Sequence, residues 1–281
     1  LIIKDRENRK PSFNLSIVDS YYYEHRAYDN IGVCYEGLGL ISEAEVAYKK
    51  AIELNNKEPL YYSNLAQLYT AQNRLAEAEN IATTTIKLGI ANDSMYLLRG
   101  KIQALRKKPH EAIDTLKQLI QINNINMHAY ISLINLLIQT NQLKEAEDAL
   151  KAIMSSNPDH LGLKCLIERI KYKNGDKKSA IKFIHNMLEL SPQNSSVYHD
   201  LGNLCIEIEE YNMAIELLER HLKYSPEDIA VISNIAICYS KLGKLESALI
   251  GFHAALKLDR TCNYVVQNIA ALNKRLENQV G

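Results

Sequence analysis

The sequence predicts an all-α protein, a right-handed superhelical solenoid of seven helical hairpins followed by a C-terminal capping helix. Three observations predict it. The 281 residues contain only 11 Gly and 6 Pro, too few turn formers for a typical all-β sandwich. Hydrophobic residues make up 47% of the chain, which argues against wholesale disorder. Alanine recurs at steps of 34 residues, at Ala44, Ala78, Ala112, Ala146, Ala180, Ala214 and Ala248.

Each 34-residue unit contains the pattern of two amphipathic helices. Twelve residues before the repeated alanine stands a second column that is mostly small, at Gly32, Ala66, Gly100, Gly202 and Ala236. Small residues at a fixed position indicate close helix contact. Apolar residues with helical spacing accompany the two columns, for example Ile31, Tyr35 and Leu38 in the first unit. Each unit is therefore expected to be a helical hairpin.

Turn and capping signals divide the chain at the same interval. Polar or glycine-bearing breaks follow the first helix of each unit at residues 37–41, 72–75, 107–110, 140–143, 174–177, 209–212 and 242–245. We expect Ser42 and Glu45 to form a capping box. Between units, a capping side chain precedes Pro158, Pro192 and Pro226, which predicts helix starts at those prolines.

These signals predict the organisation of the whole chain. Residues 1–24 are expected to form an N-terminal extension or linker leading into the first helix. Tyr21–Tyr23 are either a capping or partner-binding surface or a simple extension of that helix. Residues 261–281 are expected to form the capping helix and tail. The seven units between them are 25–58, 59–92, 93–126, 127–160, 161–194, 195–228 and 229–260.

The repeated residues resemble the tetratricopeptide repeat. Tyr28, Ile31, Gly32 and Tyr35, followed by Ala44 and Tyr48, match the pattern of that family. The resemblance covers about five-sixths of the chain and implies a stacked array with a concave, partner-binding inner surface.

Two units depart from the family pattern. The third has Arg99 and Gln103 where the family has Leu and Tyr. The fifth has Glu168 and Lys171 at the small and aromatic positions, which predicts a rotated or shifted first helix there.

The resemblance also implies which residues face the groove. They are first-helix positions 2, 5, 6, 9, 12 and 13, when the repeated alanine is position 20. A partner peptide or helix is expected to contact Asn30, Asn64, Gln67, Lys101, Asn135, Arg169, His199, Asn203, Asn234 and Asn268.

Two binding modes are open for this groove. The asparagines at position 6 resemble the asparagine ladder of O-linked N-acetylglucosamine transferases, which would bind the backbone of an extended peptide. The alternative is that they bond adjacent first helices or face solvent. An apolar stripe with basic edges lies in the middle of the groove and suits an amphipathic helix carrying acidic residues. It consists of Leu97, Leu98, Ile131, Cys165 and Leu166 and is bordered by Lys101 and Arg169. Burial of this stripe between repeats is the alternative.

Composition and motifs exclude several function classes. Lys plus Arg and Asp plus Glu are both 33, so no net charge attracts nucleic acid. Five cysteines without a C-x-x-C pair indicate neither a disulfide framework nor a zinc site. We find no zinc-protease motif, phosphate loop or catalytic pair, and expect no enzyme activity, cofactor or metal. No three consecutive units supply the carboxylate clamp of chaperone-binding repeats.

The predicted function is a non-catalytic scaffold or adaptor that binds another protein in its groove. Two alternatives are open, a substrate-recruiting arm of a larger enzyme such as a glycosyltransferase, and a structural subunit of a multi-protein assembly. Self-association through the apolar stripe is a further possibility. Reduced cysteines and the lack of a membrane-spanning run favour the cytoplasm. Because the chain begins at Leu1, we expect a trimmed piece, with an upstream signal, anchor or domain left open.

Overall fold

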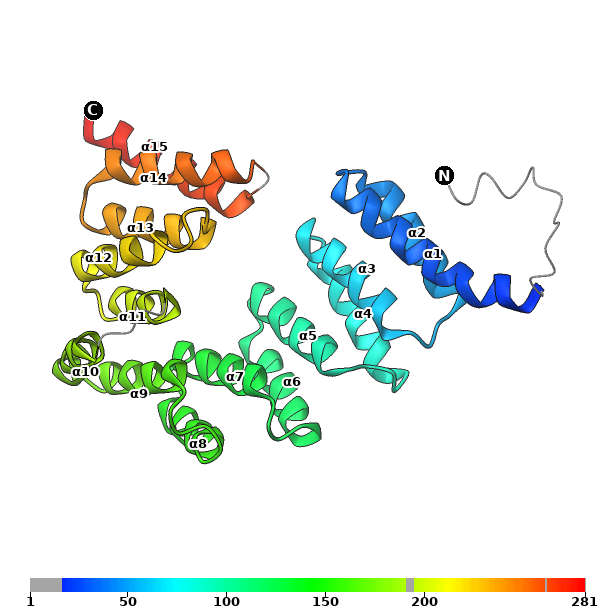
Figure 1. Ribbon diagram of the computed structural model, residues 1–281, viewed down its shortest axis with the longest axis horizontal. Helices are drawn as coiled ribbons and strands as arrows, with labels where there is room; N and C mark the ends of the chain where they lie inside the picture. The colour runs from blue at the N-terminus through cyan, green and yellow to red at the C-terminus, as the bar shows by residue number, and fades with distance from the viewer. Residues whose placement is uncertain (1–16, 191–194, 261, 281) are drawn as a thin grey trace. The chain divides into compact units, whose positions relative to one another are not determined.

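The computed structural model describes residues 17–190, 195–260 and 262–280, with side chains from residue 24 to residue 277 within those ranges. These residues form fifteen α-helices and no strand, which confirms the all-α prediction (Figure 1). The chain divides into two compact units, Leu1–Leu136 and Leu137–Gly281. None of the described helices is long and apolar enough to cross a membrane.

The first unit contains six complete helices and most of a seventh. They are α1 (Ile17–Gly37), α2 (Ile41–Leu54), α3 (Pro59–Ala71), α4 (Leu75–Lys87), α5 (Asp93–Leu105), α6 (Pro109–Ile122) and α7 (Met127–Gln139). Helices α1 and α2, α3 and α4, and α5 and α6 pack as hairpins. Each hairpin also contacts the next, through α2 with α3 and α4 with α5.

The second unit continues the pattern. Its helices are α8 (Leu143–Met154), α9 (Leu161–Lys173), α10 (Lys177–Glu189), α11 (Ser195–Glu207), α12 (Tyr211–Leu222), α13 (Ile229–Lys241), α14 (Leu245–Leu258) and α15 (Asn263–Val280). The pairs α9 and α10, α11 and α12, and α13 and α14 form hairpins, and α15 packs on α14. First helices begin at residues 59, 93, 127 and 161, at the spacing of 34 residues that the alanine column predicts.

The small column brings the two helices of a hairpin together. A Cβ added at Gly32 would lie 2.5 Å from Cε1 of Tyr48, and one at Gly202 would lie 2.6 Å from Cδ2 of Leu218. Tyr48 and Leu218 are buried, as are all seven repeated alanines. The cores of these two hairpins therefore depend on the missing side chain of a glycine in the first helix.

Every hairpin turn places one residue in the left-handed backbone region, again 34 residues apart. These residues are Gly39, Asn73, Lys107, Asn141, Gly175, Glu209 and Gly243, with φ between 57° and 95°. Glycine and asparagine adopt this region easily, whereas Lys107 and Glu209 adopt it at a cost. At Glu209 the turn is closed by the amide of Glu210, which donates to the carbonyl of Cys205 at 2.8 Å.

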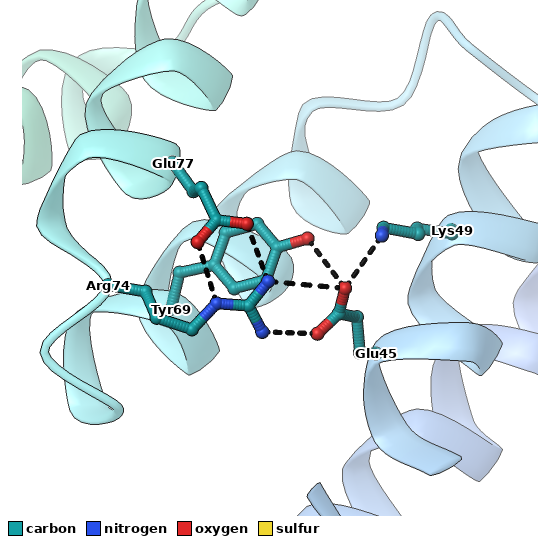
Figure 2. A network of polar contacts seen from close by, with 5 residues as sticks. All are labelled: Glu45, Lys49, Tyr69, Arg74 and Glu77. Carbon is teal, nitrogen blue, oxygen red and sulfur yellow. Dashed lines mark hydrogen bonds and ion pairs between the residues drawn. The ribbon is translucent and has the colours of Figure 1, made fainter. Parts of the chain in front are cut away.

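A polar network joins the first two hairpins (Figure 2). Nη1 of Arg74 donates to Glu45 Oε2 at 2.5 Å, and Arg74 Nη2 reaches Glu77 Oε1 at 2.5 Å. The Tyr69 hydroxyl and the Lys49 ammonium donate to Glu45 Oε1 at 3.0 and 2.6 Å. The hydrogen bond from Arg74 is the largest cause that lowers the pKa of Glu45 to about 2. Glu45 thus bonds α2 to the turn between α3 and α4.

The departures in repeats three and five have polar partners. Gln103 is buried, and its Nε2 donates to Glu79 at 3.2 Å while its Oε1 accepts from Thr115 at 2.8 Å. Glu168 is buried too and accepts from Lys171 and Ser179, both at 2.8 Å. Helix α9 begins in phase with α3, α5 and α7, so the fifth repeat shows no shift along the chain.

Three expected caps are wrong. Helix α2 begins after Leu40, which makes no side-chain cap, and Glu45 is bonded into the network of Figure 2 instead. Helices α9 and α13 begin after His160 and Asp228, whose side chains accept from the amides of Leu163 and Val231. They start three residues after the predicted prolines, Pro158 and Pro226. In both helices the side chain directly before the first helical residue forms the cap, and the Asn-Pro and Ser-Pro pairs upstream do not start the helix.

Some expectations fall outside the described residues. They concern residues 1–16, the cap at Ser191–Asn194 and the side chains of Tyr21–Tyr23, although the backbone of these three tyrosines belongs to α1. The boundaries of the N-terminal extension, the seven repeats and the tail stay predictions.

Candidate functional site

A hollow of about 480 Å³ lies in the first unit where α5, α6 and α7 meet. Helix α5 lines it with Leu97, Leu98, Gly100, Lys101 and Ala104, helix α6 with Leu116, and helix α7 with His128, Ser132, Asn135 and Leu136. In the repeat register these α5 and α7 residues include the expected groove positions 2, 5, 6, 9 and 12. The volume is within the range of small-molecule and peptide side-chain pockets.

Small side chains account for the open space. The lining includes Gly100 and Ala104, four residues apart on α5, and Ser132 on α7. A Cβ at Gly100 would lie 3.2 Å from Cγ of Leu116, so α5 and α6 are already close behind the hollow. The close approach of α5 and α6 at Gly100 thus brings Leu116 into the lining.

The hollow is apolar with a basic rim. Leu97, Leu98, Leu116 and Leu136 provide its large apolar side chains. Its only ionisable lining residues are Lys101 and His128, which are both exposed and take part in no ion pair among the described residues. An anionic group at this rim would therefore meet basic side chains and no carboxylate of the lining.

The other expected residues of the first unit lie outside the hollow. Asn64 is half-buried, and its Nδ2 donates to Oδ1 of Asp29 at 2.8 Å, which bonds α3 to α1. Burial raises the pKa of Asp29 above its ordinary value. Asn30 and Gln67 are exposed. Of the ten expected site residues, the structure brings only Lys101 and Asn135 together at the hollow.

A polar row on α11 and α13 unites three expected residues of the second unit. Asn234 Nδ2 donates to Asn203 Oδ1 at 3.0 Å, and Asn203 Nδ2 lies 3.1 Å from His199 Nε2. His199 Nδ1 contacts Asp200 at 3.4 Å, and this hydrogen bond raises the pKa of His199. The His221 ring centroid lies 5.4 Å from that of His199.

The last two expected residues, Arg169 and Asn268, bond to other residues of the second unit. Arg169 Nη2 forms an ion pair with Glu207 at 3.0 Å, which joins α9 to α11. Asn268 Nδ2 donates to the carbonyl of Tyr264, one turn earlier in α15. Cys165 and Leu166, the second-unit members of the expected apolar stripe, are buried, as the alternative interpretation expected.

Sequence reasoning did not include several lining residues among the expected contacts. His128 and Ser132 occupy groove positions 2 and 6, so the repeat register alone contained the signal for them. Leu116 belongs to the second helix of its hairpin, and Gly100 faces that helix. Their part in the hollow depends on helix spacing, which the register does not specify.

Comparison with protein families finds three matches. The profile of the ChAPs family, described as Chs5p-Arf1p-binding proteins, matches residues 110–276. Two profiles described as tetratricopeptide repeat match residues 25–58 and 60–88.

Among curated proteins, the chain is similar to the human protein O-mannosyl-transferase TMTC3, with 24% identity over 245 residues that cover 79% of this chain and 26% of that protein. It is also similar to anaphase-promoting complex subunit 7 of Dictyostelium discoideum, with 22% identity over 75% of this chain and 36% of that protein. The chain thus spans between about a quarter and just over a third of these two relatives.

Two solved structures show the same fold. A tetratricopeptide repeat protein from Parabacteroides merdae matches with a TM-score of 0.62 at 16% identity, covering 89% of this chain and 98% of that one. A chain of the APC/C hetero-tetramer Cut9-Hcn1 matches with a TM-score of 0.53 at 15% identity, covering 91% of this chain and 44% of that one.

Proposed function

This chain belongs to the tetratricopeptide repeat superfamily and, over residues 110–276, to the Chs5p-Arf1p-binding protein family, and from that premise we propose that it is a non-catalytic scaffold that holds a segment of a partner protein against its first helices. Stacked repeats of this kind present a continuous inner surface for partners. Within each unit, the proposed contact surface is the row of first-helix groove positions, and in the first unit it includes the hollow between α5 and α7.

The hollow is the observation that carries this proposal. It is lined by first-helix residues of two consecutive repeats together with Leu116 of α6, it is mostly apolar, and it has polar groups at Lys101, His128 and Asn135 to orient a bound segment. A concave apolar surface with a few convergent polar groups is the usual form of a binding site.

A non-catalytic role agrees with the state of the cysteines. Cys205 and Cys238 are buried, and burial raises the pKa of their thiols to about 12 and about 11. Thiols with such pKa values stay protonated at neutral pH and are poor nucleophiles. We also propose a reducing compartment such as the cytoplasm, because the five cysteines, of which Cys34 is exposed, show no C-x-x-C pair and are an odd number.

Site-specific photo-crosslinking in cells of the source organism tests the proposal. A photoreactive residue is placed at Ser132, which lines the hollow, and in a matched variant at Gln118, which is exposed on α6 outside the lining. We expect crosslinks to a partner protein from Ser132 that are absent from Gln118. Crosslinks from Gln118 alone would contradict binding at the first helices.

A subunit of a multi-protein assembly is the second candidate function. It is favoured by large apolar side chains that are exposed on second helices, such as Val46 on α2 and Ile250 on α14, which are 68% and 72% exposed. The similarity to an anaphase-promoting complex subunit agrees with it. In this case photoreactive residues at Val46 and Ile250 would capture several stable neighbours, and a photoreactive residue at Ser132 would capture none of them.

A further inference from the structure

We propose that the occupant of the hollow between α5 and α7 is an amphipathic helix whose apolar face is bordered by acidic side chains. This inference rests on the proposed function, because it names the partner chemistry of the same surface. Three observations support it: the volume of the hollow, the charge of its rim, and the hydrogen bonds that the asparagine side chains form within the protein.

The volume fits several side chains from one face of a helix. An apolar cavity of about 150 Å³ in another protein holds one benzene ring. The hollow measures about 480 Å³, so it accommodates two or three apolar side chains at once. On a helix, residues at i, i+3 and i+4 project from one face within one turn and reach one site together. In an extended strand, neighbouring side chains point to opposite faces, and fewer of them would enter.

The charge of the rim selects the residues that flank this face. Lys101 on α5 and His128 on α7 are exposed, and neither forms an ion pair with a described residue. The remaining lining residues are uncharged. A carboxylate beside the docked apolar face would give Lys101 and His128 a polar partner. A Lys or Arg at the same place would be repelled by Lys101. The surface therefore favours an acidic helix over a basic one.

The asparagines argue against an extended peptide. A ladder that reads a peptide backbone needs amides that are available along the row. Of the four asparagines at position 6, Asn64, Asn234 and Asn268 each donate one N–H within the protein, to Asp29, Asn203 and the carbonyl of Tyr264, and Asn30 is exposed. At the hollow itself, position 6 holds Leu98 and Ser132 in place of asparagine. This region therefore lacks the amide row that the extended mode requires.

Three synthetic peptides of about 18 residues, or five helical turns, test the inference by fluorescence anisotropy with the full chain. One presents a leucine face bordered by glutamates, and the second has lysines in place of the glutamates. The third is the acidic peptide with a central proline that breaks the helix. We expect the acidic helix to bind at least about tenfold more tightly than either of the others. Equal affinities for acidic and basic peptides, or for helical and broken peptides, would overturn the inference.

Variants of the protein place the binding at the hollow. Lys101→Glu combined with His128→Glu should reverse the preference between acidic and basic peptides, whereas Lys87→Glu, an exposed lysine of α4, should leave it unchanged. Ser132→Trp should fill the hollow and abolish binding, and Gln118→Trp is its control. Unchanged affinity in the Lys101 and His128 variant or in folded Ser132→Trp would overturn the inference, and thermal melting verifies the folding.

The proposed function can survive the failure of this inference. If Ser132 crosslinks a partner segment that binds equally well after a helix-breaking proline is introduced, the groove function stands and the helical occupant is wrong. If no peptide binds and Ser132 captures no partner, both are wrong.

Discussion

Asn234 of α13 donates a hydrogen bond of 3.0 Å to Oδ1 of Asn203 on α11, so two residues expected to contact a partner bond adjacent first helices to each other. Both asparagines are half-buried. Asn203 continues the row to His199 at 3.1 Å. The amides therefore contribute to the stability of the second unit, whether or not a partner also contacts them.

The change Asn234→Ala should lower the free energy of unfolding by about 1 kcal/mol, because it removes one hydrogen bond and leaves Oδ1 of Asn203 without its donor. Urea unfolding at neutral pH measures this loss. Asn30→Ala, at the equivalent position of the first repeat but exposed, is the control and should change stability little. Equal unfolding midpoints for the two variants would show that the Asn234 bond contributes nothing.

Gly32→Ala should destabilise the first hairpin. The added Cβ would lie 2.5 Å from the ring of Tyr48, which is 1% exposed and donates a hydrogen bond from its hydroxyl to Glu36 at 2.8 Å. Because the ring is enclosed and bonded, we expect overpacking to cost about 1 to 3 kcal/mol. Thermal melting of Gly37→Ala provides the control, since a Cβ at Gly37 meets nothing within 4 Å. A melting temperature equal to that of Gly37→Ala would contradict the close approach.

Glu209→Gly should stabilise the protein, although most glycine substitutions destabilise. Glu209 has φ 63°, a backbone conformation that glycine adopts without strain from a Cβ. We expect a gain of about 0.5 to 1 kcal/mol after the higher entropy of the unfolded glycine chain is included. The control is Glu219→Gly, at an exposed position inside α12, which should lower the free energy of unfolding by about 1 kcal/mol. Chemical denaturation measures both variants. A loss of stability in Glu209→Gly would mean that the Glu209 side chain has contacts that outweigh the strain.

The period of the fold was predictable from the sequence because it depends on local residue patterns. Alanines at steps of 34 residues and small residues such as Gly32 determine how two helices of one hairpin pack, and those contacts are close in sequence. The caps at Pro158 and Pro226 were predicted wrongly, since two capping signals lie within three residues and the nearer one, His160 or Asp228, begins the helix. Local patterns do not decide between such neighbours.

The candidate site was less predictable, because its residues come from three helices. The groove register includes Lys101 and Asn135, which the hollow unites, but it also includes Asn64 and Asn234. Whether an asparagine faces a partner or a neighbouring helix depends on the residue opposite, Asp29 for Asn64 and Asn203 for Asn234. Those pairs lie 35 and 31 residues apart, and no spacing rule within one repeat links them.

The last prediction concerns the pH dependence of the network around Arg74 (Figure 2). In the folded state the pKa of Glu45 is lowered from 4.5 to about 2, with the hydrogen bond from Arg74 as its largest cause. A carboxyl with a lowered folded-state pKa contributes stability that is fully present above its unfolded pKa and is lost as the pH falls through the folded pKa. The contribution of this network should therefore be constant above about pH 5 and decline between about pH 4.5 and pH 2.

Arg74→Gln tests this by removing the guanidinium. The difference in unfolding free energy between the natural chain and Arg74→Gln should be largest near neutral pH and should shrink as the pH falls below about 4.5, as measured by urea unfolding at a series of pH values. Lys50→Gln is the matched control, because Lys50 pairs with Glu53 in an exposed site where solvent screens the charges. If the Arg74 difference were the same at pH values of about 3 and about 7, the Glu45 carboxylate would not be the partner that gives Arg74 its effect.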